Sequence, residues 1–317
     1  MSQHPSLSTI TTATVFGSMD LVRAFSRRSS VVRAALLVLS CAVSFPPVAF
    51  AKTTEVPPGA GTLQAAIDAA APGDRLVLAT FGLYSPGIVI DKPLRIQGNG
   101  ATIDAECTSA VGIDIASDRV KLSKLGTTRA TQTGIRIVDH TRISLDFVSV
   151  SLFTIREDYA CGTEETAIEI AGSVDDVKLS GVVVTEDQSA FEIGLHLHDI
   201  PVDSTILLKG KGRAINWFDG TEAGVLIENC GAGSAVGGSG ILMQRSGLPG
   251  DTDALRLVNT DGVLVKRNIF FGGGVSIDAN SDLNRFENND SDTSVPLDDL
   301  GTGNCGRENP FTMSTCN

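Results

Sequence analysis

Aromatic side chains and cations are scarce in this chain. Aromatic residues make up 5% of the sequence, with one Trp and two Tyr. The formal net charge is −12 at pH 7, since 25 Lys and Arg stand against 37 Asp and Glu. This negative charge argues against nucleic acid and anionic membranes as partners. It also disfavours a polyanionic substrate, unless a cation or a local basic patch intervenes.

Recognisable metal-binding and cofactor-binding motifs are also missing. The sequence contains no CxxC, HExxH or other metal-ligand spacing. His196 and His198 are two residues apart, so on a strand both side chains point the same way. Such a pair can hold a metal, but further ligands are needed, and hydrogen-bonded histidines are the preferred interpretation. No cofactor is evident from the sequence.

The N-terminal segment has the features of an export signal. Four Arg precede the short apolar run 34–43, and Ala49-Phe50-Ala51 fits a small-x-small cleavage site. The run is too short to span a bilayer with those flanks. We predict an export signal over residues 1–51, with Met19 as an alternative start, and one domain over residues 52–317. Loss of four Arg and one Asp would shift the net charge from −12 to −15.

The cysteines fit a secreted or periplasmic protein, in which disulfides are permitted. Cys305 and Cys316 would close a short loop at the C-terminus, and we expect them to pair. Cys107 and Cys161 form a second candidate pair, which would leave Cys230 free.

A two-part repeat dominates the chain from Gly112 onward. Its first part is a small residue followed by apolar-x-apolar, at Gly112-Ile113-Asp114-Ile115, Gly134-Ile135-Arg136-Ile137, Ala167-Ile168-Glu169-Ile170, Gly194-Leu195-His196-Leu197, Ala214-Ile215-Asn216-Trp217, Ala254-Leu255-Arg256-Leu257 and Gly274-Val275-Ser276-Ile277. The second part is another strand of period two, as in Val120-Lys121-Leu122 and Val177-Lys178-Leu179. Short strands in units of roughly 20–25 residues, without regular helix, are typical of a β-solenoid. An antiparallel sandwich would not explain the two-part unit.

The opening of the domain resembles that of pectate-lyase-like right-handed β-helix proteins. The resemblance rests on Thr62-Leu63-Gln64-Ala65-Ala66-Ile67, then Pro72-Gly73-Asp74, then Lys92-Pro93-Leu94-Arg95-Ile96, and it extends from Gly59 to the C-terminus. It implies an all-β, right-handed parallel β-helix (solenoid) with a short N-terminal capping helix. It further implies an inner asparagine ladder at Asn268 and Asn289, with Cys230 at the equivalent place. The resemblance is specific for the fold and weak for activity.

In-register stacking of the repeats predicts one outward-facing column of side chains, comprising Asp114, Arg136, Glu169, His196, Asn216, Arg256 and Ser276. Carboxylate, imidazole and guanidinium are the groups that β-elimination or glycoside hydrolysis requires. The candidate catalytic residues are therefore Arg136, Glu169, His196 and Arg256. The alternating signs favour a simpler structural interpretation, in which neighbouring rungs pair across strands.

Other signals argue against particular enzyme classes. Asn259-Thr260-Asp261-Gly262 resembles one polygalacturonase motif, but the paired Asp and the Gly-His-Gly of that family are missing, so a turn is the plainer account. No acidic cluster with a partnering Arg supports Ca²⁺, although such folds are compatible with it. Trp217 is expected to point inward, which lowers the case for sugar stacking. The insertions 151–166 and 231–253, the second carrying Arg245, are candidate binding loops.

Two functions remain open from the sequence. The first is an exported β-helix protein that binds or cleaves an extracellular polysaccharide, with a lyase favoured over a glycoside hydrolase. The second is a non-catalytic structural or adhesive protein of a surface or matrix. A pocket between residues 151–166 and His196 would favour the first. Neither the substrate nor the oligomeric state follows from the sequence.

Overall fold

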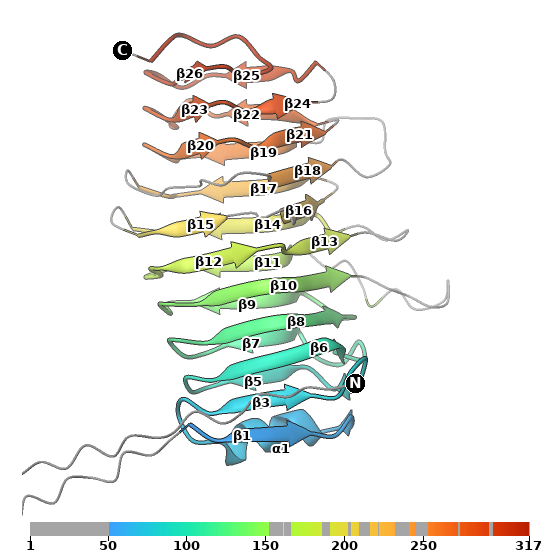
Figure 1. Cartoon of the computed structure of the whole chain (residues 1–317). Coiled ribbons are helices and arrows are strands. Elements are labelled where there is room, and N and C mark those ends of the chain that lie inside the picture. Colours follow the sequence, from blue (N-terminus) through green and yellow to red (C-terminus); the bar gives the residue numbers. More distant parts are fainter. Residues whose placement is uncertain are drawn as a thin grey trace, which may run out of the picture. The chain divides into compact units, whose positions relative to one another are not determined.

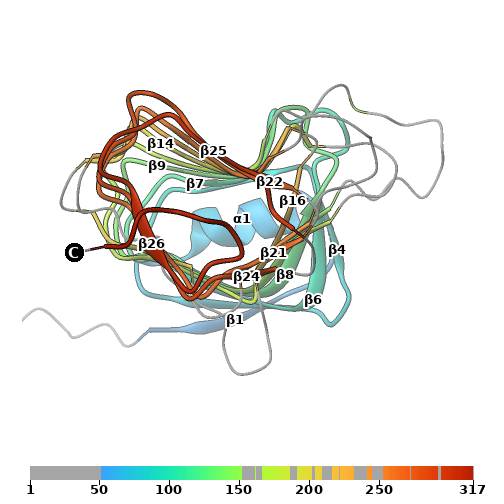
Figure 2. The ribbon, with the colours of Figure 1, turned by 90° about the horizontal axis from the view of Figure 1, so that it is seen from above.

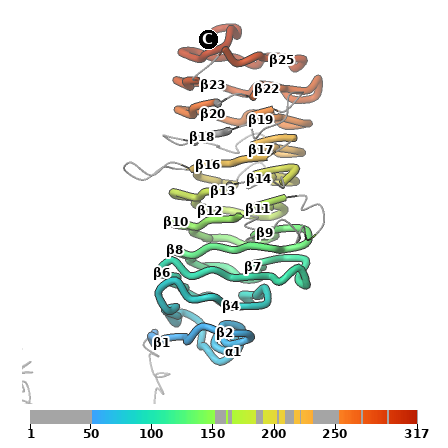
Figure 3. Tube along the Cα trace, turned by 90° about the vertical axis from the view of Figure 1, so that its right-hand side faces the viewer, coloured from blue at the N-terminus to red at the C-terminus, as the bar shows by residue number. Residues whose placement is uncertain are grey.

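The computed structural model shows successive coils stacked in sequence order within one β-helix unit, Ala49–Asn317 (Figures 1 and 3). The structure describes residues 51–151, 161, 166–185, 191–201, 204–208, 216–220, 222–231, 241–244, 253–271, 273–291 and 294–316. The predicted export signal therefore lies outside the described residues, apart from Ala51. Within the described ranges, no helix is long and apolar enough to cross a membrane.

Parallel strands form three sheets in the described part of the chain. The nine-stranded sheet contains β5 (Ile88–Ile90), β7 (Val111–Ile115), β9 (Thr133–Val138), β11 (Thr166–Ala171), β14 (Ile193–His198), β17 (Ala223–Glu228), β19 (Asp253–Val258), β22 (Gly274–Ile277) and β25 (Leu297–Asp299). The three-stranded sheet contains β20 (Leu264–Lys266), β23 (Arg285–Glu287) and β26 (Cys305–Arg307).

The fourteen-stranded sheet bends at a corner into two halves. It contains β1 (Thr53–Val56), β2 (Gly59–Ala60), β3 (Arg75–Leu78), β4 (Leu83–Ser85), β6 (Arg95–Asp104), β8 (Lys121–Thr128), β10 (Ser144–Ser151), β12 (Val177–Ser180), β13 (Val183–Thr185), β15 (Ile206–Leu208), β16 (Asn216–Asp219), β18 (Ile241–Gln244), β21 (Ile269–Phe271) and β24 (Asp290–Ser291). We call β3, β12, β15 and the first residues of β6, β8 and β10 the leading half. The last residues of β6, β8 and β10, with β13, β16, β18, β21 and β24, form the trailing half.

Each coil passes from the nine-stranded sheet to the leading half or the three-stranded sheet, and then to the trailing half. Figure 2 shows this three-sided section along the stack. Connections between parallel strands of one sheet are right-handed because of strand twist. The observed fold is thus the right-handed parallel β-helix that the repeat and the resemblance predicted.

The period-two pattern explains which side chains form the core. In the leading half, Leu122, Leu145 and Leu179 are buried and lie in register on successive coils. Their neighbours Lys121 and Lys178 face outward and are exposed. Because neighbouring strands are about 4.8 Å apart, apolar side chains stack into continuous columns, and each coil buries its core only against adjacent coils.

The corner between the two halves carries the asparagine ladder. Asn268 and Asn289 are buried there, and the Asn268 N–H donates to Asn289 Oδ1 at 2.9 Å. Asn216 occupies the same column, where its Oδ1 accepts the Val182 N–H at 2.8 Å. The predicted ladder is confirmed, but the placement of Cys230 in it is wrong. Cys230 lies in another turn, where its N–H donates to Thr260 Oγ1 at 3.4 Å.

Helix α1 (Thr62–Ala69) closes the N-terminal end, as predicted (Figures 1 and 2). Leu63 and Ile67 are buried against the first coil. Gln64 contacts the edge strand β5: its Oε1 accepts the Val89 N–H at 2.9 Å, and its Nε2 donates to the Val89 carbonyl at 3.2 Å. The helix therefore covers apolar core and also satisfies backbone groups of an edge strand.

Among the described residues, disulfides join Cys107 to Cys161 and Cys305 to Cys316. Both expected pairs are confirmed, and Cys230 is free and buried. Burial raises the pKa of the Cys230 thiol to about 11, so the reactive thiolate is disfavoured at neutral pH.

Candidate functional site

The predicted column lies on the outer face of the nine-stranded sheet. Strand register places these residues on successive rungs: Val89, Asp114, Arg136, Glu169, His196, Leu226, Arg256, Ser276 and Asp298. Six of the seven predicted members are therefore confirmed in position. The column forms because every coil contributes the central residue of an apolar-x-apolar strand, and that residue must point away from the core.

Asn216 is the exception, and the prediction of its position was wrong. Strand β16 pairs with β13 and β18 in the trailing half, and Asn216 is completely buried at the corner. Leu226 of β17 takes its place between His196 and Arg256. Trp217 was also misplaced: it is half-buried between the buried Asn216 and Phe218, so it belongs to the outer face.

Arg136 is held by a carboxylate on the preceding rung. Its Nε and Nη2 donate to the two carboxylate oxygens of Asp114 at 3.1 and 2.7 Å. The hydrogen bond with Asp114 raises the pKa of Arg136, and the nearby charge of Glu169 acts in the same direction. This two-point contact fixes the guanidinium on the sheet surface.

Glu169 pairs with His198, which the sequence did not single out as catalytic. His198 Nε2 lies 3.1 Å from Glu169 Oε1, and its Nδ1 lies 2.9 Å from Asp199 Oδ2. The contact with Glu169, reinforced by Asp199, raises the pKa of His198 to about 9. The hydrogen bond from His198 lowers the pKa of Glu169. At neutral pH this pair is therefore a carboxylate and an imidazolium.

His196 has the opposite electrostatics. Its ring centroid lies 4.4 Å from that of His198, and its Nε2 lies 3.3 Å from Glu228 Oε2. Burial lowers the pKa of His196, and the positive charge of His198 lowers it further, against the opposing effect of Glu228. The site thus holds a neutral imidazole beside a protonated one at neutral pH.

Arg256 is separated from His196 by one rung. Leu226 lies between them, so their strands are about 10 Å apart, as are those of Arg136 and His196. Arg256 Nε lies 3.2 Å from Asp253 Oδ2, which also accepts a hydrogen bond from Ser276 Oγ at 2.6 Å. The four candidate residues therefore line one surface, with a cation on either side of His196.

The segment Asn259-Thr260-Asp261-Gly262, which resembles one polygalacturonase motif, forms a turn. Asn259 and Gly262 have positive φ angles of 47° and 67°. Thr260 is buried, and Asp261 Oδ1 accepts the Asp282 N–H at 2.8 Å. These side chains serve the backbone of adjacent coils, as the sequence indicated.

The binding-loop predictions fall mostly outside the described residues. The described residues leave out 152–160, 162–165, 232–240 and 245–252. Arg245 and the expected pocket between residues 151–166 and His196 therefore also lie outside the described residues. In the described ranges, no group of three or more His, Cys, Asp or Glu side chains is arranged to hold a metal ion.

Stacked three-sided coils, an inner asparagine ladder and an N-terminal capping helix together define a right-handed parallel β-helix. No family model matches the chain, and no curated protein matches it. A crystal structure of alginate lyase from Paenibacillus sp. str. FPU-7 is similar, with 12% identity, coverage of 78% of this chain and 99% of that chain, and a TM-score of 0.47.

Two further solved structures cover most of the chain. Pectate lyase Pel9A has 13% identity, covers 82% of this chain and 80% of its own, and has a TM-score of 0.43. PfbA, a surface adhesin of Streptococcus pneumoniae, has 10% identity, covers 80% of this chain and 83% of its own, and has a TM-score of 0.35. At such low identity the likeness concerns the fold alone.

Proposed function

We propose that this protein is an exported β-helix protein that binds an extracellular anionic polysaccharide along the column and cleaves it by β-elimination at His196. The observation that carries the proposal is the contact between His196 and His198, whose pKa values are shifted in opposite directions. Adjacent groups with pKa values pushed apart are suited to separate acid and base roles. The two disulfides support export, because disulfides persist in oxidising compartments.

Each group in the site has a defined role in this chemistry. Elimination removes the proton next to the sugar carboxylate and expels the glycosidic oxygen on the adjacent carbon. Neutral His196 accepts that proton. Protonated His198 and Arg136 provide positive charge for the sugar carboxylate, whose electron density rises as the proton leaves. A proton delivered to the departing oxygen, from His198 or from water, completes the balance and leaves an unsaturated sugar end.

The non-catalytic alternative is favoured by one specific observation. Arg136, Glu169, His196 and Arg256 each have an ionic or hydrogen-bonding partner already within the sheet surface. A fully paired ladder stabilises adjacent coils without requiring any ligand. A stable spacer or adhesive platform would need no more than this.

Turnover assays separate the two functions. The purified protein is incubated with polyuronates and neutral glycans, with and without Ca²⁺, while ultraviolet absorbance reports unsaturated ends and a second assay reports reducing ends. We expect unsaturated product, which His196→Ala abolishes without lowering Tm and the matched variant His140→Ala leaves intact. Reducing ends without absorbance would mean hydrolysis and contradict the proposal. If neither assay detects product, the non-catalytic, adhesive function is favoured.

A further inference from the structure

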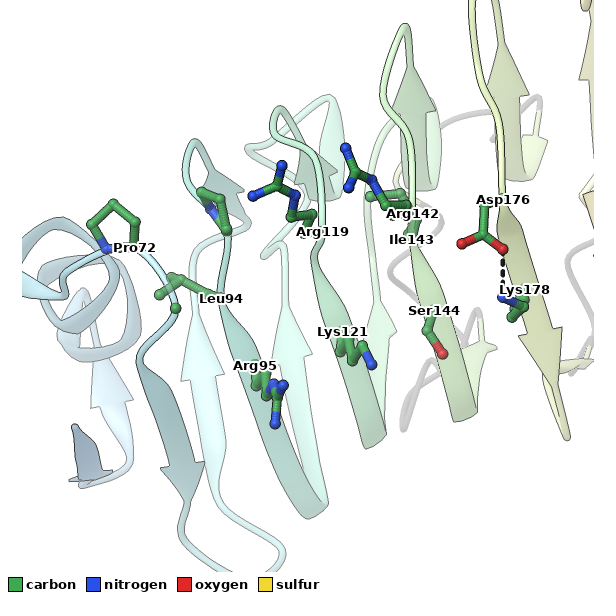
Figure 4. Close-up of a pocket in the computed structure, with 12 residues that line it drawn as sticks. Pro72, Leu94, Arg95, Arg119, Lys121, Arg142, Ile143, Ser144, Asp176 and Lys178 are labelled. Carbon is green, nitrogen blue, oxygen red and sulfur yellow. Dashed lines mark hydrogen bonds and ion pairs between the residues drawn. The ribbon is translucent and has the colours of Figure 1, made fainter. Parts of the chain in front are cut away.

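A strongly basic groove lies on the leading half, away from the nine-stranded sheet (Figure 4). It has a volume of about 500 Å³ and runs across the coils of β6, β8, β10 and β12. Its charged lining residues are Arg95, Arg119, Lys121, Arg142, Lys178 and Asp176. Five cations and one carboxylate therefore line one groove in a chain whose net charge is −12.

The repeat itself places these cations in two parallel rows. Arg95, Lys121, Ser144 and Lys178 are in register on successive strands, one rung of about 4.8 Å apart. Arg75 continues this row toward the N-terminal end, next to Arg95. The row therefore follows the axis of the β-helix.

The second row comes from the turns that precede the strands. Arg119, Arg142 and Asp176 each stand two residues before a member of the first row, and all three have positive φ angles, of 59°, 60° and 53°. Figure 4 shows the side chains of both rows along the same side of the leading half. Four of the five cations thus lie beside a neighbour of like charge: Arg95 beside Lys121 in the first row, and Arg119 beside Arg142 in the second.

Little of this charge is neutralised by the protein. Among the described residues, the one ion pair within the groove lining joins Lys178 to Asp176. Asp118 is close enough to Arg142 to be affected by its charge, but the Asp118 carboxylate accepts the Thr141 N–H at 2.9 Å and lies 3.5 Å from His140. Arg95, Arg119 and Lys121 are exposed. The fold holds these like charges side by side, and an anion that binds between them reduces their mutual repulsion.

We propose that this groove is a second binding site, which holds a linear anionic polysaccharide parallel to the β-helix axis. Regularly spaced cations in a row fit a polymer that repeats one negative group per sugar. The proposal goes beyond the proposed cleavage, because the groove and His196 lie on different sheets and use no residue in common. Binding here would keep the enzyme on its substrate, or an adhesin on its matrix.

The lining disfavours the other common polyanions. No aromatic side chain is present among the twelve lining residues, whereas single-stranded nucleic acid is usually held by stacking on aromatic rings. The lining also presents Pro72, Pro93 and the buried Leu94 rather than protruding apolar anchors of the kind that enter a bilayer. A glycan needs neither feature.

A pair of double variants tests the site. Arg95→Glu/Lys121→Glu reverses two groove charges, whereas Lys124→Glu/Arg267→Glu reverses two exposed cations at the corner and changes the net charge equally. Binding of a polyuronate and of a sulfated polysaccharide is measured by calorimetry at several salt concentrations. We expect the groove variant to weaken binding of at least one of them about tenfold or more, and to flatten its salt dependence. The corner variant should change affinity by less than about twofold.

Three outcomes would overturn the proposal. In the first, both double variants weaken polysaccharide binding equally. In the second, the unmodified protein binds neither polysaccharide. In the third, single-stranded DNA or phosphatidylserine vesicles compete for the groove as effectively as the polysaccharide does. The Tm of each variant is measured to establish that it is folded. In a His196→Ala background, which removes cleavage, the groove variant should still bind less tightly than the corner variant, and the groove variant with His196 intact should cleave short oligomers at the unmodified rate. Failure of the groove and failure of the cleavage site are thus distinguishable.

Discussion

The pair formed by His198 and Glu169 predicts a specific dependence of stability on pH. The folded-state pKa of His198 is about 9, against an ordinary value of 6.5. A group with a raised pKa stabilises the folded state fully below its unfolded pKa, and this contribution is lost as pH rises through the folded pKa. The stabilisation from His198 should therefore be complete below pH 6.5 and gone above about pH 9.

The structure also bounds the size of this effect. The pKa difference corresponds to at most roughly 3 kcal/mol, because one pKa unit is about 1.4 kcal/mol. Both side chains are about one-quarter exposed, with 23% for His198 and 25% for Glu169, so solvent screening reduces the expected value to about 1–2 kcal/mol. His196 stays neutral in this pH range because its pKa is lowered, so it does not obscure the measurement.

The assay is urea unfolding of the unmodified protein, His198→Gln, Glu169→Gln and the double variant between pH 6 and pH 10. The free energy lost in His198→Gln should shrink steadily from pH 6.5 to pH 9. The double-mutant cycle should assign the pH-dependent part to the pair. A loss that is constant with pH, or that grows as pH rises, would refute the assignment of a protonated His198.

Three further predictions concern the scaffold. Glu287 is nearly buried beside Lys266, Arg285 and Arg307, which lower its pKa, so Glu287→Gln should lower Tm at neutral pH, and the difference from the unmodified protein should shrink as the solution is acidified. Gly98→Ala should cost about 2–3 kcal/mol in urea unfolding, because an added Cβ would lie 2.3 Å from the Leu125 Cβ and 2.4 Å from the Lys124 carbonyl oxygen. Removing Cys107–Cys161, which spans 54 residues, should cost about 4 kcal/mol, more than the roughly 3 kcal/mol for Cys305–Cys316, which spans 11. Equal losses from the two cysteine-pair variants would contradict the loop-entropy argument, and a neutral Gly98→Ala would contradict the close packing.

The fold followed from the sequence because every coil buries the same pattern. Strands of period two, such as Lys121-Leu122-Ser123, must place one side chain in the core and two outside. Repetition fixes parallel stacking, since neighbouring coils present equivalent residues to each other. The outward column at Arg136, Glu169 and His196 therefore could be predicted without any structure.

Local pattern alone could not assign every strand to its sheet. Ala214-Ile215-Asn216-Trp217 matches the repeat, yet β16 belongs to the trailing half, while Gly224-Val225-Leu226-Ile227 supplies the rung of the nine-stranded sheet. Sheet membership depends on the path of the whole coil, and insertions make coil lengths unequal. With the rung at Leu226 unrecognised, Glu228 could not be found as the partner of His196.

The basic groove was missed for a different reason. Its cations are separated by more than twenty residues in several cases, and the strongly negative net charge concealed them. A signal was nevertheless present, because Leu94-Arg95-Ile96, Val120-Lys121-Leu122 and Val177-Lys178-Leu179 carry a cation at the same repeat position. Averaged composition describes the whole surface, whereas binding depends on charge at one place.

The contact between Gln64 and Val89 has a consequence for assembly. The Gln64 amide presents one acceptor and one donor to Val89, the same pair that a neighbouring strand would present. At the opposite edge of that sheet, β25 carries Asp298 and Asp299, whose charges oppose the approach of another strand. One edge of this sheet is therefore occupied by Gln64 and the other carries negative charge, so both edges disfavour pairing with a strand from another molecule.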